Sequence, residues 1–423
     1  MLFERPAERR FLVGIDLRDD YCQISFTEKG RTTPKEPVTF TMVKGEEKFD
    51  IPMALCRVKE GGRWLAGPEA LSHAGEEGAV YIPGILSLVR EGSAVRIDSR
   101  DVDASALLAM YLKRCLDMMS ATVPLGEIAA IMFTSREMDK KMIGAIQTVR
   151  ERLSLSCSVY CESYANSYYN YMLMQPQVLR EPGVLLAEMQ KGGRLYIEKL
   201  LFNQHTRPIV AYREEKIYPG IFGDTGREQD DAFLQILQKE MDGRIFASAY
   251  LLGSGFSRDW MKKSVSFLCR GRRVFMGNNL YSKGAAYGAL LRTVHSEVQD
   301  RYYFLDSNKL RTNVGMRALI RGEAAYYPFL DAGVNWYEAD KTADLILEDG
   351  NEIHLALKPL TGGEASDFLI RLEGLPVREG RIARVRLHFT MTAQDKLHID
   401  IEDLGFGEIF PKSGLKWVQE ISV

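Results

Sequence analysis

The chain has 423 residues, of which 46% are apolar, and its formal net charge is -2 with a pI near 6.4. This composition is typical of a globular protein with two or three cored domains, and it excludes a disordered chain or a disulfide-stapled miniprotein. A nearly neutral charge gives no general electrostatic reason to bind nucleic acid or an anionic membrane. We therefore expect neither of them as a partner.

Cysteine usage and the N-terminal residues predict a cytoplasmic protein. Residues 1–11 carry several charges and lead directly into a strand-like run, so we expect no secretory signal. No segment reaches the roughly 18 consecutive apolar residues that a membrane helix needs. The cysteines have no C-x-x-C spacing and no nearby histidines, which predicts buried thiols and no metal site. They are Cys22, Cys56, Cys115, Cys157, Cys161 and Cys269.

The first pattern along the chain is a hairpin that is followed by a helix and a strand. Phe11–Leu17 and Tyr21–Thr27 are β-rich runs on either side of a polar step, which predicts a strand, a turn and a strand. Between Ala104 and Met119 the apolar residues recur at helical spacing. A short β-rich run over Ile128–Thr134 follows, so this helix leads into a sheet.

A second helix and a second hairpin come next. Ser135 is predicted to cap a helix with one apolar face, and Cys157–Cys161 is predicted to be the strand after it. Val184–Met189 and Leu195–Phe202, on either side of the turn Gln190–Gly193, predict the second hairpin. The chain is thus expected to form two halves of sheet and helix, each opened by a hairpin.

After about residue 300 the pattern changes to short alternating runs without a long helical period. Such runs, separated by turns, predict an all-β module over residues 301–423. The runs are at 343–347, 352–357, 368–372 and 385–389, and the turns are at 348–351, 361–363 and 378–380.

Several segments of the first 300 residues contain glycines or carboxylates near predicted strand ends. They are Gly14–Asp20, Val159–Ala165, Glu188–Gly193, Leu251–Arg258 and Gly284–Ala289. In this order they resemble motifs of DnaK-type heat-shock chaperones, which belong to the actin-like ATPase superfamily. The corresponding motifs are the first phosphate loop, the stretch with the catalytic glutamate, the second phosphate loop, the adenosine loop and the alanine-rich helix after it.

The C-terminal part carries an independent resemblance. Leu372–Pro376, Val385–Phe389 and Asp395–Ile401 are similar to the closing strands of the chaperone peptide-binding sandwich. Together the two resemblances imply an α/β actin-like (ribonuclease H-like) two-lobed nucleotide-binding domain over residues 1–300. An all-β sandwich over residues 301–423 is implied to follow it.

Parts of the family plan have no counterpart in this sequence. The chain ends soon after the matching strands, so we expect no helical lid. There is little room between Val184 and Gly253 for the extra subdomain of the family, and residues 302–310 do not resemble its apolar interdomain linker. The expected protein is therefore a shortened relative of the DnaK-type chaperones.

The resemblance implies a nucleotide site for ATP or ADP with Mg²⁺. It places the catalytic carboxylates at Asp16, Glu162 and Glu188. From the residues alone, a structural role for Glu162 as a buried, hydrogen-bonded carboxylate is as well supported as a catalytic role. The glycines are explained first by the backbone conformations that turns require. The implied cofactor-binding residues are Arg18, Lys191, Gly192, Gly193, Gly253, Ser254, Gly255, Arg258, Gly284 and Tyr287.

The implied phosphate site is degenerate. A phosphate loop needs glycines, which let backbone N–H groups approach the phosphates, and small hydroxylated residues for Mg²⁺. The first loop instead has Arg18, Asp19 and Asp20, and no lysine lies between Lys59 and Lys113 to supply the catalytic lysine of the family. We therefore expect nucleotide hydrolysis to be lost or very slow.

Repulsion between carboxylates is a second reason to expect weak nucleotide hydrolysis. Asp16, Asp19, Asp20 and Glu188 are expected to lie within several ångströms of one another, with Arg18 and Lys191 offsetting part of the repulsion. A pair of like charges about 4 Å apart costs on the order of 4 kcal/mol at an effective dielectric constant of 20.

These observations favour a noncatalytic, chaperone-type or scaffold protein that binds a protein partner or a peptide. Two alternatives stay open. One is an active actin-like ATPase or kinase with unusual phosphate loops, and the other is a filament-forming or cell-division protein of the same superfamily. The sequence leaves the oligomeric state open.

Overall fold

The computed structural model divides the chain into two compact units, Met1–Phe304 (unit 1) and Leu305–Val423 (unit 2). The boundary predicted from the sequence was between residues 300 and 301. The structure describes residues 9–423 except 31–34, 44, 222, 224, 307, 348–349, 360–363, 377–382 and 409. Among the described residues, no helix combines the length and apolar character needed to cross a bilayer.

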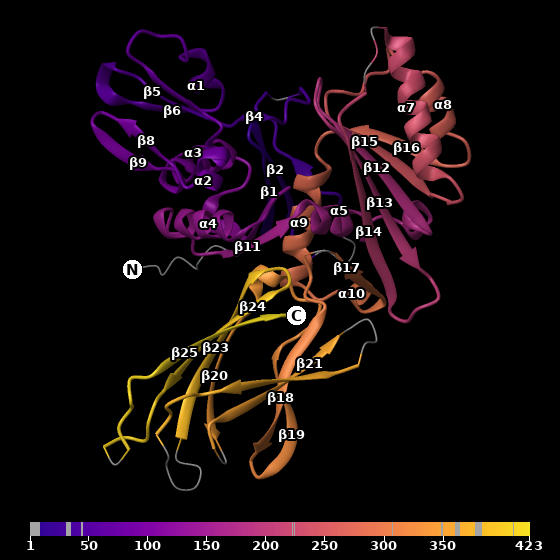
Figure 1. The fold of residues 1–423 in the computed structure, drawn as a ribbon. Helices are drawn as coiled ribbons and strands as arrows, with labels where there is room; N and C mark the ends of the chain where they lie inside the picture. Colours follow the sequence, from indigo (N-terminus) through magenta and orange to yellow (C-terminus); the bar gives the residue numbers. More distant parts are fainter. Residues whose placement is uncertain are drawn as a thin grey trace. The chain divides into compact units, whose positions relative to one another are not determined.

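The first sheet of unit 1 is opened by the predicted hairpin (Figure 1). Its strand order is β11-β10-β1-β2-β3, with β4 also paired to β2. β1 runs antiparallel to β2 and parallel to β10, which in turn is parallel to β11. The strands are β1 (Phe11–Leu17), β2 (Tyr21–Glu28), β3 (Val38–Thr39), β4 (Ile51–Pro52), β10 (Ile128–Ser135) and β11 (Ser158–Ser163).

A small α/β insertion separates β4 from β10. It contains a three-stranded sheet in the order β6-β5-β7 and a two-stranded hairpin, β8-β9. Its longest helix, α3, spans the predicted residues Ala104–Met119, and Asp103 caps it by accepting a hydrogen bond from the Ser105 N–H. The other elements are β5 (Ala54–Arg57), η1 (Glu60–Gly62), β6 (Trp64–Ala66), α1 (Pro68–Ser72), β7 (Val80–Pro83), α2 (Ile85–Glu91), β8 (Ala94–Ile97), β9 (Arg100–Asp103) and η2 (Leu125–Glu127).

The helix after β10 starts later than predicted. The prediction that Ser135 caps it is wrong, because Ser135 is the last residue of β10. α4 (Lys140–Arg152) is capped by Asp139, whose carboxylate accepts from the Met142 N–H at 2.8 Å. Arg136 therefore lies in the segment between the end of β10 and the start of α4, so its side chain is not part of a helix face.

The second sheet of unit 1 repeats the plan of the first. Its order is β16-β15-β12-β13-β14-β17, in which β12 is antiparallel to β13 and parallel to β15. Both sheets thus have a hairpin flanked by parallel strands on one side. The strands are β12 (Gly183–Met189), β13 (Leu195–Asn203), β14 (Ile209–Tyr218), β15 (Ser248–Leu252), β16 (Arg273–Gly277) and β17 (Tyr302–Leu305).

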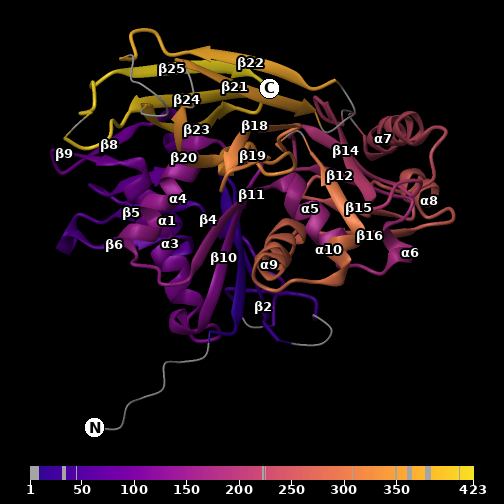
Figure 2. The same ribbon diagram turned by 90° about the horizontal axis from the view of Figure 1, so that it is seen from below.

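Helices cover the second sheet on both of its faces. α7 and α8 pack on one face through Phe233, Leu237 and Leu268, while α5 and α9 pack on the other through Tyr168 and Tyr281. In Figure 2, α5 and α9 lie between the strands of the two sheets. The helices are α5 (Tyr164–Leu173), α6 (Gln177–Arg180), α7 (Gly226–Met241), α8 (Lys263–Leu268), α9 (Leu280–Thr293) and α10 (Glu297–Arg301).

Two glycines let α9 lie close to its neighbours. A Cβ on Gly14 of β1 would come within 2.2 Å of the Ala286 nitrogen, and a Cβ on Gly284 would come within 2.0 Å of the Ser167 carbonyl oxygen of α5. Real side-chain atoms do not approach so closely, so both positions need glycine for packing. This close packing places the N-termini of α5 and α9 beside the ends of β1 and β12.

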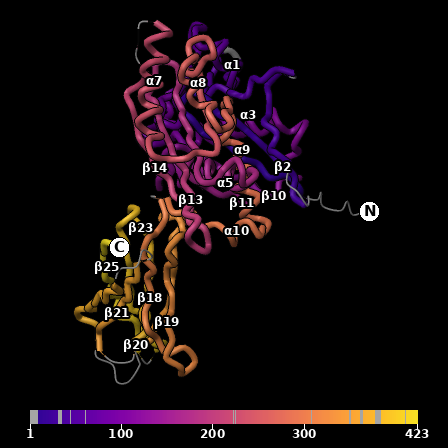
Figure 3. Tube along the Cα trace, turned by 90° about the vertical axis from the view of Figure 1, so that its right-hand side faces the viewer, coloured from indigo at the N-terminus to yellow at the C-terminus, as the bar shows by residue number. Residues whose placement is uncertain are grey.

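Unit 2 contains strands and one short helical turn in its described residues (Figure 3). Two four-stranded antiparallel sheets, β19-β18-β21-β22 and β20-β23-β24-β25, share one apolar core. Phe329 of the first sheet stacks on Phe389 of the second with ring centroids 4.3 Å apart. The elements are β18 (Thr312–Ile320), β19 (Glu323–Leu330), η3 (Trp336–Glu338), β20 (Asp340–Leu347), β21 (Glu352–Pro359), β22 (Ser366–Arg371), β23 (Ala383–Ala393), β24 (Lys396–Asp403) and β25 (Lys416–Ser422).

Some predictions lie partly or wholly outside the described residues. These are the turns at 361–363 and 378–380, residues 348–349 of the first predicted turn, and residues 1–8 of the N-terminal segment. The prediction of buried thiols is confirmed for Cys22, Cys56, Cys115 and Cys157, but Cys161 is half-buried and Cys269 is exposed. All six cysteines are free thiols.

Candidate functional site

The candidate site is an ion-paired cluster where the hairpins of the two sheets meet. Arg18, in the turn after β1, donates to Asp16 Oδ2 at 3.1 Å and to Glu188 Oε1 at 2.5 Å. Asp16 and Glu188 stand at the ends of β1 and β12, with 0% and 3% of their surface exposed. One guanidinium therefore bridges the two carboxylates that the resemblance assigned to opposite phosphate loops.

A second guanidinium completes the cluster. Arg136 donates to Glu188 Oε2 and lies 3.6 Å from Glu198 Oε1 and 3.3 Å from Glu215 Oε1. Lys191 was expected to offset the repulsion, but it lies in the following turn and Arg136 takes this role instead. We call Asp16, Arg18, Arg136, Glu188 and Glu198 the arginine–carboxylate cluster.

Two stacked tyrosines enclose the cluster. Tyr164 and Tyr281, the first residue of α5 and the second of α9, stack with ring centroids 3.9 Å apart. The Tyr164 hydroxyl donates to Asp16 Oδ1, and the Tyr281 hydroxyl lies 3.0 Å from Glu188 Oε2. The guanidinium of Arg18 lies over both rings, 5.2 and 5.5 Å from their centroids. Cation–π contacts of this kind are worth more when they are shielded from water.

The two carboxylates differ in their preferred charge. Burial raises the pKa of Asp16, because desolvation outweighs the attraction of Arg18 and the hydrogen bond from Tyr164. Burial acts in the same direction on Glu188, but the attraction of Arg18 and Arg136 outweighs it, so the pKa of Glu188 is lowered. Burial also raises the pKa of Tyr164 and of Tyr281, so both hydroxyls stay protonated and can donate. Glu188 is thus the carboxylate that these two cations hold ionised.

Two of the predicted acidic neighbours lie outside the cluster. The Asp19 carboxylate accepts hydrogen bonds from Ser87 at 2.9 Å and from Arg90 at 2.8 Å, both on α2. Asp20 is exposed. The charge of Asp19 is thus offset by Arg90 of α2, a cation that the local sequence around Asp19 does not reveal.

Glu162 lies on β11 and is separated from Asp16 of β1 by the strand β10. Its carboxylate accepts from Ser167 Oγ at 2.5 Å and from Asn170 Nδ2 at 2.9 Å, both on α5. A Cβ on Gly288 of α9 would lie 2.7 Å from Glu162 Oε2. The structure therefore places Glu162 under two helices as a buried, hydrogen-bonded carboxylate, which was one of the two readings from the sequence.

The donor set of the cluster does not fit a nucleotide with bound Mg²⁺. Mg²⁺ prefers carboxylate oxygens and water as ligands. Both oxygens of Asp16 and both oxygens of Glu188 already accept hydrogen bonds from arginine or tyrosine side chains. Among the residues that the structure describes, no group of three His, Cys, Asp or Glu side chains could hold a metal ion.

A separate pocket of about 520 Å³ adjoins the turn after β12. Several of the predicted cofactor-binding residues line it, together with residues before α7 and in its first turn. We call it the Gly255 pocket. It is lined by Met189, Lys191, Gly192, Gly193, Gly220, Ile221, Gly223, Gln229, Ser254, Gly255, Ser257 and Trp260.

The loop that brings Ser254 and Gly255 into this pocket depends on glycines, and Gly253, which precedes them, does not itself line the pocket. Gly253 has φ of 96°, and a Cβ there would lie 2.4 Å from the Met189 carbonyl oxygen. The N–H of Gly255 donates to that same oxygen at 2.9 Å. The Gln190 side chain accepts from the N–H and the hydroxyl of Ser254 at 3.2 and 2.9 Å. The turn after β12 and the loop after β15 are therefore joined by these hydrogen bonds.

Asp230 of α7 fixes the far side of the same loop. Its buried carboxylate accepts from the backbone N–H groups of Lys262, Lys263 and Ser264, at 3.0, 2.6 and 2.9 Å. These are the first N–H groups of α8, which have no partners inside the helix. Asp230 therefore anchors the segment that carries Trp260 into the pocket wall.

The remaining predicted cofactor residues lie elsewhere. Gly284 is at the crossing of α5 and α9, and Tyr287 is buried in a core cluster with Leu12 and Met132. Arg258 is exposed, and none of these three residues lines the Gly255 pocket. Gly284 and Tyr287 both take part in the packing of α9 against its neighbours.

Sequence reasoning missed Arg136, Tyr164, Tyr281 and Trp260 as site residues. One signal could have found Arg136: it follows directly after β10, and parallel strands such as β1 and β10 end at the same edge of a sheet. The tyrosines gave no such signal, because a tyrosine in a helix is usually a packing residue.

The structure defines an α/β unit with an ion-paired cluster between two hairpin-led sheets, and a second unit of antiparallel strands. Comparison with known families divides the chain near the same boundary. Residues 36–307 match the family of unknown function DUF5716 (C-terminal), and residues 309–423 match a domain of unknown function, DUF8552. The chain therefore belongs to the DUF5716 family. No curated protein matches it.

Proposed function

We propose that unit 1 is a DnaK-like, actin-type domain that has lost phosphoryl transfer, and that the protein is a scaffold or chaperone-type protein that binds a protein or peptide partner. The observation that carries this proposal is the arginine–carboxylate cluster. Arg18 and Arg136 join the ends of β1 and β12 at the place where such a domain would hold phosphates.

The energetics of the cluster support a structural role. Removing one member of a buried ion pair typically costs about 3–5 kcal/mol, because the other charge is left uncompensated. A phosphate that entered here would have to take the guanidinium groups away from Glu188, which is almost fully buried. Rapid binding and release of a nucleotide would repeat this cost in every cycle. The cluster therefore weighs against the alternative of an active ATPase or kinase.

The outer strands of the two sheets in unit 2 support the partner-binding part of the proposal. β19 and β22 are the outer strands of one sheet, and β20 and β25 are the outer strands of the other. An outer strand has backbone N–H and C=O groups that an extended peptide can pair with.

The decisive measurement is ATP turnover by the full chain. We expect no hydrolysis above background, with or without Mg²⁺, and no change in Asp16→Ala. Turnover that disappears in Asp16→Ala would show that the cluster is an active site. Titration with ADP, read by thermal shift, detects any residual nucleotide binding, because a ligand that binds the folded state raises its stability.

The Gly255 pocket is the place where such residual binding is expected. Ser257→Trp fills the pocket and should remove the ADP-induced shift. The matched control is Ser266→Trp on the exposed face of α8, which should leave the shift unchanged. Gly255→Trp is a poor test, because a Cβ at this position would lie 2.7 Å from the Met189 side chain and would distort the loop itself.

A further inference from the structure

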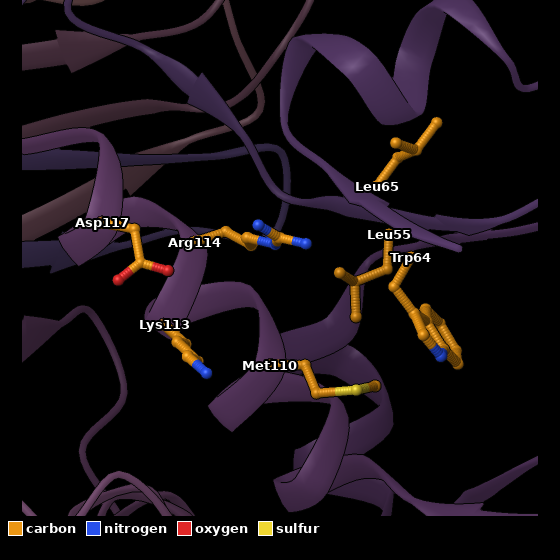
Figure 4. Close-up of a pocket in the computed structure, with 7 residues that line it drawn as sticks. All are labelled: Leu55, Trp64, Leu65, Met110, Lys113, Arg114 and Asp117. Carbon is orange, nitrogen blue, oxygen red and sulfur yellow. The ribbon is translucent and has the colours of Figure 1, made fainter. Parts of the chain in front are cut away.

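A second pocket lies in the α/β insertion, away from the cluster, between α3 and the sheet of β5 and β6 (Figure 4). Its volume is about 240 Å³. We call it the α3 pocket. It is lined by Leu55 of β5, Trp64 and Leu65 of β6, and Met110, Lys113, Arg114 and Asp117 of α3.

The walls of the α3 pocket are apolar and well supported. Leu55 and Leu65 are 1% and 4% exposed, so they belong to the packed interior. Trp64 is half-buried, and the Arg57 guanidinium lies 5.7 Å from its ring centroid. Arg57 is itself held by Asp98. The aromatic wall is therefore positioned before any ligand arrives.

The rim of the pocket carries free positive charge. Lys113 and Arg114 are exposed, and among the described residues neither side chain forms an ion pair or a hydrogen bond. In Figure 4 the Arg114 side chain extends from α3 toward Leu55, Lys113 lies near Met110, and Met110 points toward Trp64. Asp117 is the single acidic residue of the lining, so the charge of the lining is positive. Such a rim attracts a carboxylate.

The size of the pocket favours a protein segment over a small molecule. Pockets for small ligands usually measure about 300–1,000 Å³, whereas one large apolar side chain needs less space. Met118, which is 38% exposed, follows Arg114 by one helical turn and extends the apolar surface along α3 beyond the pocket. An extended segment would cover both Met118 and the pocket.

We propose that the α3 pocket holds an aromatic or large aliphatic side chain from an acidic segment of a protein partner, whose carboxylates pair with Lys113 and Arg114. The proposal rests on the proposed role as a protein-binding scaffold, and it gives that scaffold a docking site of defined chemistry. Burial of one apolar anchor supplies most of the affinity, and the cationic rim selects acidic neighbours.

The test uses the full chain labelled with 5-fluorotryptophan. The chain has four tryptophans, and Trp64→Phe assigns the signal of Trp64. The probes are acetylated peptides Glu-Glu-X-Glu-Glu, in which X is each amino acid in turn, and the matched series Lys-Lys-X-Lys-Lys. We expect the Trp64 signal to shift saturably with the acidic series, most strongly when X is Phe, Trp, Leu or Met.

Two charge reversals separate this site from general electrostatics. Lys113→Glu should weaken the acidic peptides about tenfold, which corresponds to roughly 1.4 kcal/mol. Lys140→Glu makes the same change at an exposed position of α4 and should leave the affinity unchanged. Both side chains are exposed, so neither variant is expected to disturb folding.

Several outcomes would overturn the inference. They are equal binding of the acidic and basic series, a Trp64 signal that does not move at millimolar peptide, and binding of free phenylacetate without binding of any peptide. ATP turnover in the same samples reports separately on the proposed function. Turnover would overturn the scaffold role, whereas a silent Trp64 without turnover would overturn the α3 site alone.

Discussion

At the scale of single residues, Arg18 pairs with two carboxylates whose pKa values shift in opposite directions. Its guanidinium lies between a carboxylate whose pKa is raised and one whose pKa is lowered. The difference arises from the number of cations: among the residues that the structure describes, Glu188 pairs with both Arg18 and Arg136, whereas Asp16 pairs with Arg18. Two carboxylates at corresponding strand ends therefore contribute to stability with opposite signs.

Isosteric amides test this difference. Glu188→Gln should destabilise unit 1 by about 3–5 kcal/mol at neutral pH, because it removes a buried carboxylate and leaves the half-buried guanidinium groups of Arg18 and Arg136 undercompensated. Asp16→Asn should cost little or even stabilise, because it removes a carboxylate whose desolvation outweighs its attractions. The measurement is hydrogen exchange of β1 and β12 in each variant. A larger loss for Asp16→Asn than for Glu188→Gln would contradict the assignment.

The pH dependence follows from the same shifts. The pKa of Glu188 is lowered in the folded state from 4.5, so its stabilisation is present above pH 4.5 and is lost as the pH falls below that value. The pKa of Asp16 is raised from 3.8, so its contribution is favourable below pH 3.8 and is lost as the pH rises through the folded value. The stability difference between the wild type and Glu188→Gln should therefore shrink in acid. The advantage of Asp16→Asn should grow toward neutral pH.

At the scale of elements, the crossing of α5 and α9 positions the cluster. The two helices approach each other at Gly284, where no side-chain atom fits against the Ser167 carbonyl group. Their first turns carry Tyr164 and Tyr281, which stack on each other and bind the two carboxylates. Close helix packing and site geometry are therefore coupled.

The same substitution in two helices should have opposite effects. Gly284→Ala forces α5 and α9 apart and should cost about 3 kcal/mol or more. Gly144→Ala in α4 meets no atom within 4 Å and should stabilise by about 0.5–1 kcal/mol, because alanine restricts the unfolded chain and favours the helix. Denaturant unfolding checks both values. A neutral Gly284→Ala would mean that the helices separate more easily than this packing allows.

The sequence predicted the helices and strands more reliably than the residues of the candidate site. The periodicity between Ala104 and Met119 was sufficient for α3, because that helix buries one continuous face. The α4 cap was misplaced because Ser135 and Asp139 are both good capping residues, and only the length of β10 decides between them. In the candidate site, Asp16, Arg18 and Glu188 were named correctly as neighbours. Arg136 and Arg90 were missed, because their roles depend on contacts between distant elements.

At the scale of the whole molecule, the chain contains two units with separate cores. The core of unit 2 is formed by residues from Leu310 to Ile421, and none of the described core clusters of unit 1 includes a residue beyond Phe304. Cores that share no residues are expected to unfold independently.

Phe389→Ala tests this independence. Phe389 is fully buried and stacks on Phe329, so its removal should destabilise unit 2 by about 3–5 kcal/mol. Hydrogen exchange should accelerate in β18–β25 and stay unchanged in β1 and β12. Faster exchange throughout unit 1 would show that the two units unfold together.

The repeated strand order of unit 1 has a consequence for symmetry. Asp16 and Glu188 occupy equivalent places, since each is the last residue but one of the first strand of its hairpin. Two equivalent carboxylates that share one neighbourhood repel each other, and a cation on either half can offset both charges. In this chain the cation that pairs with both carboxylates comes from the first half. Here the residue two places beyond the carboxylate is Arg18 in one half and Gln190 in the other, so the charge balance of the interface depends on the broken symmetry.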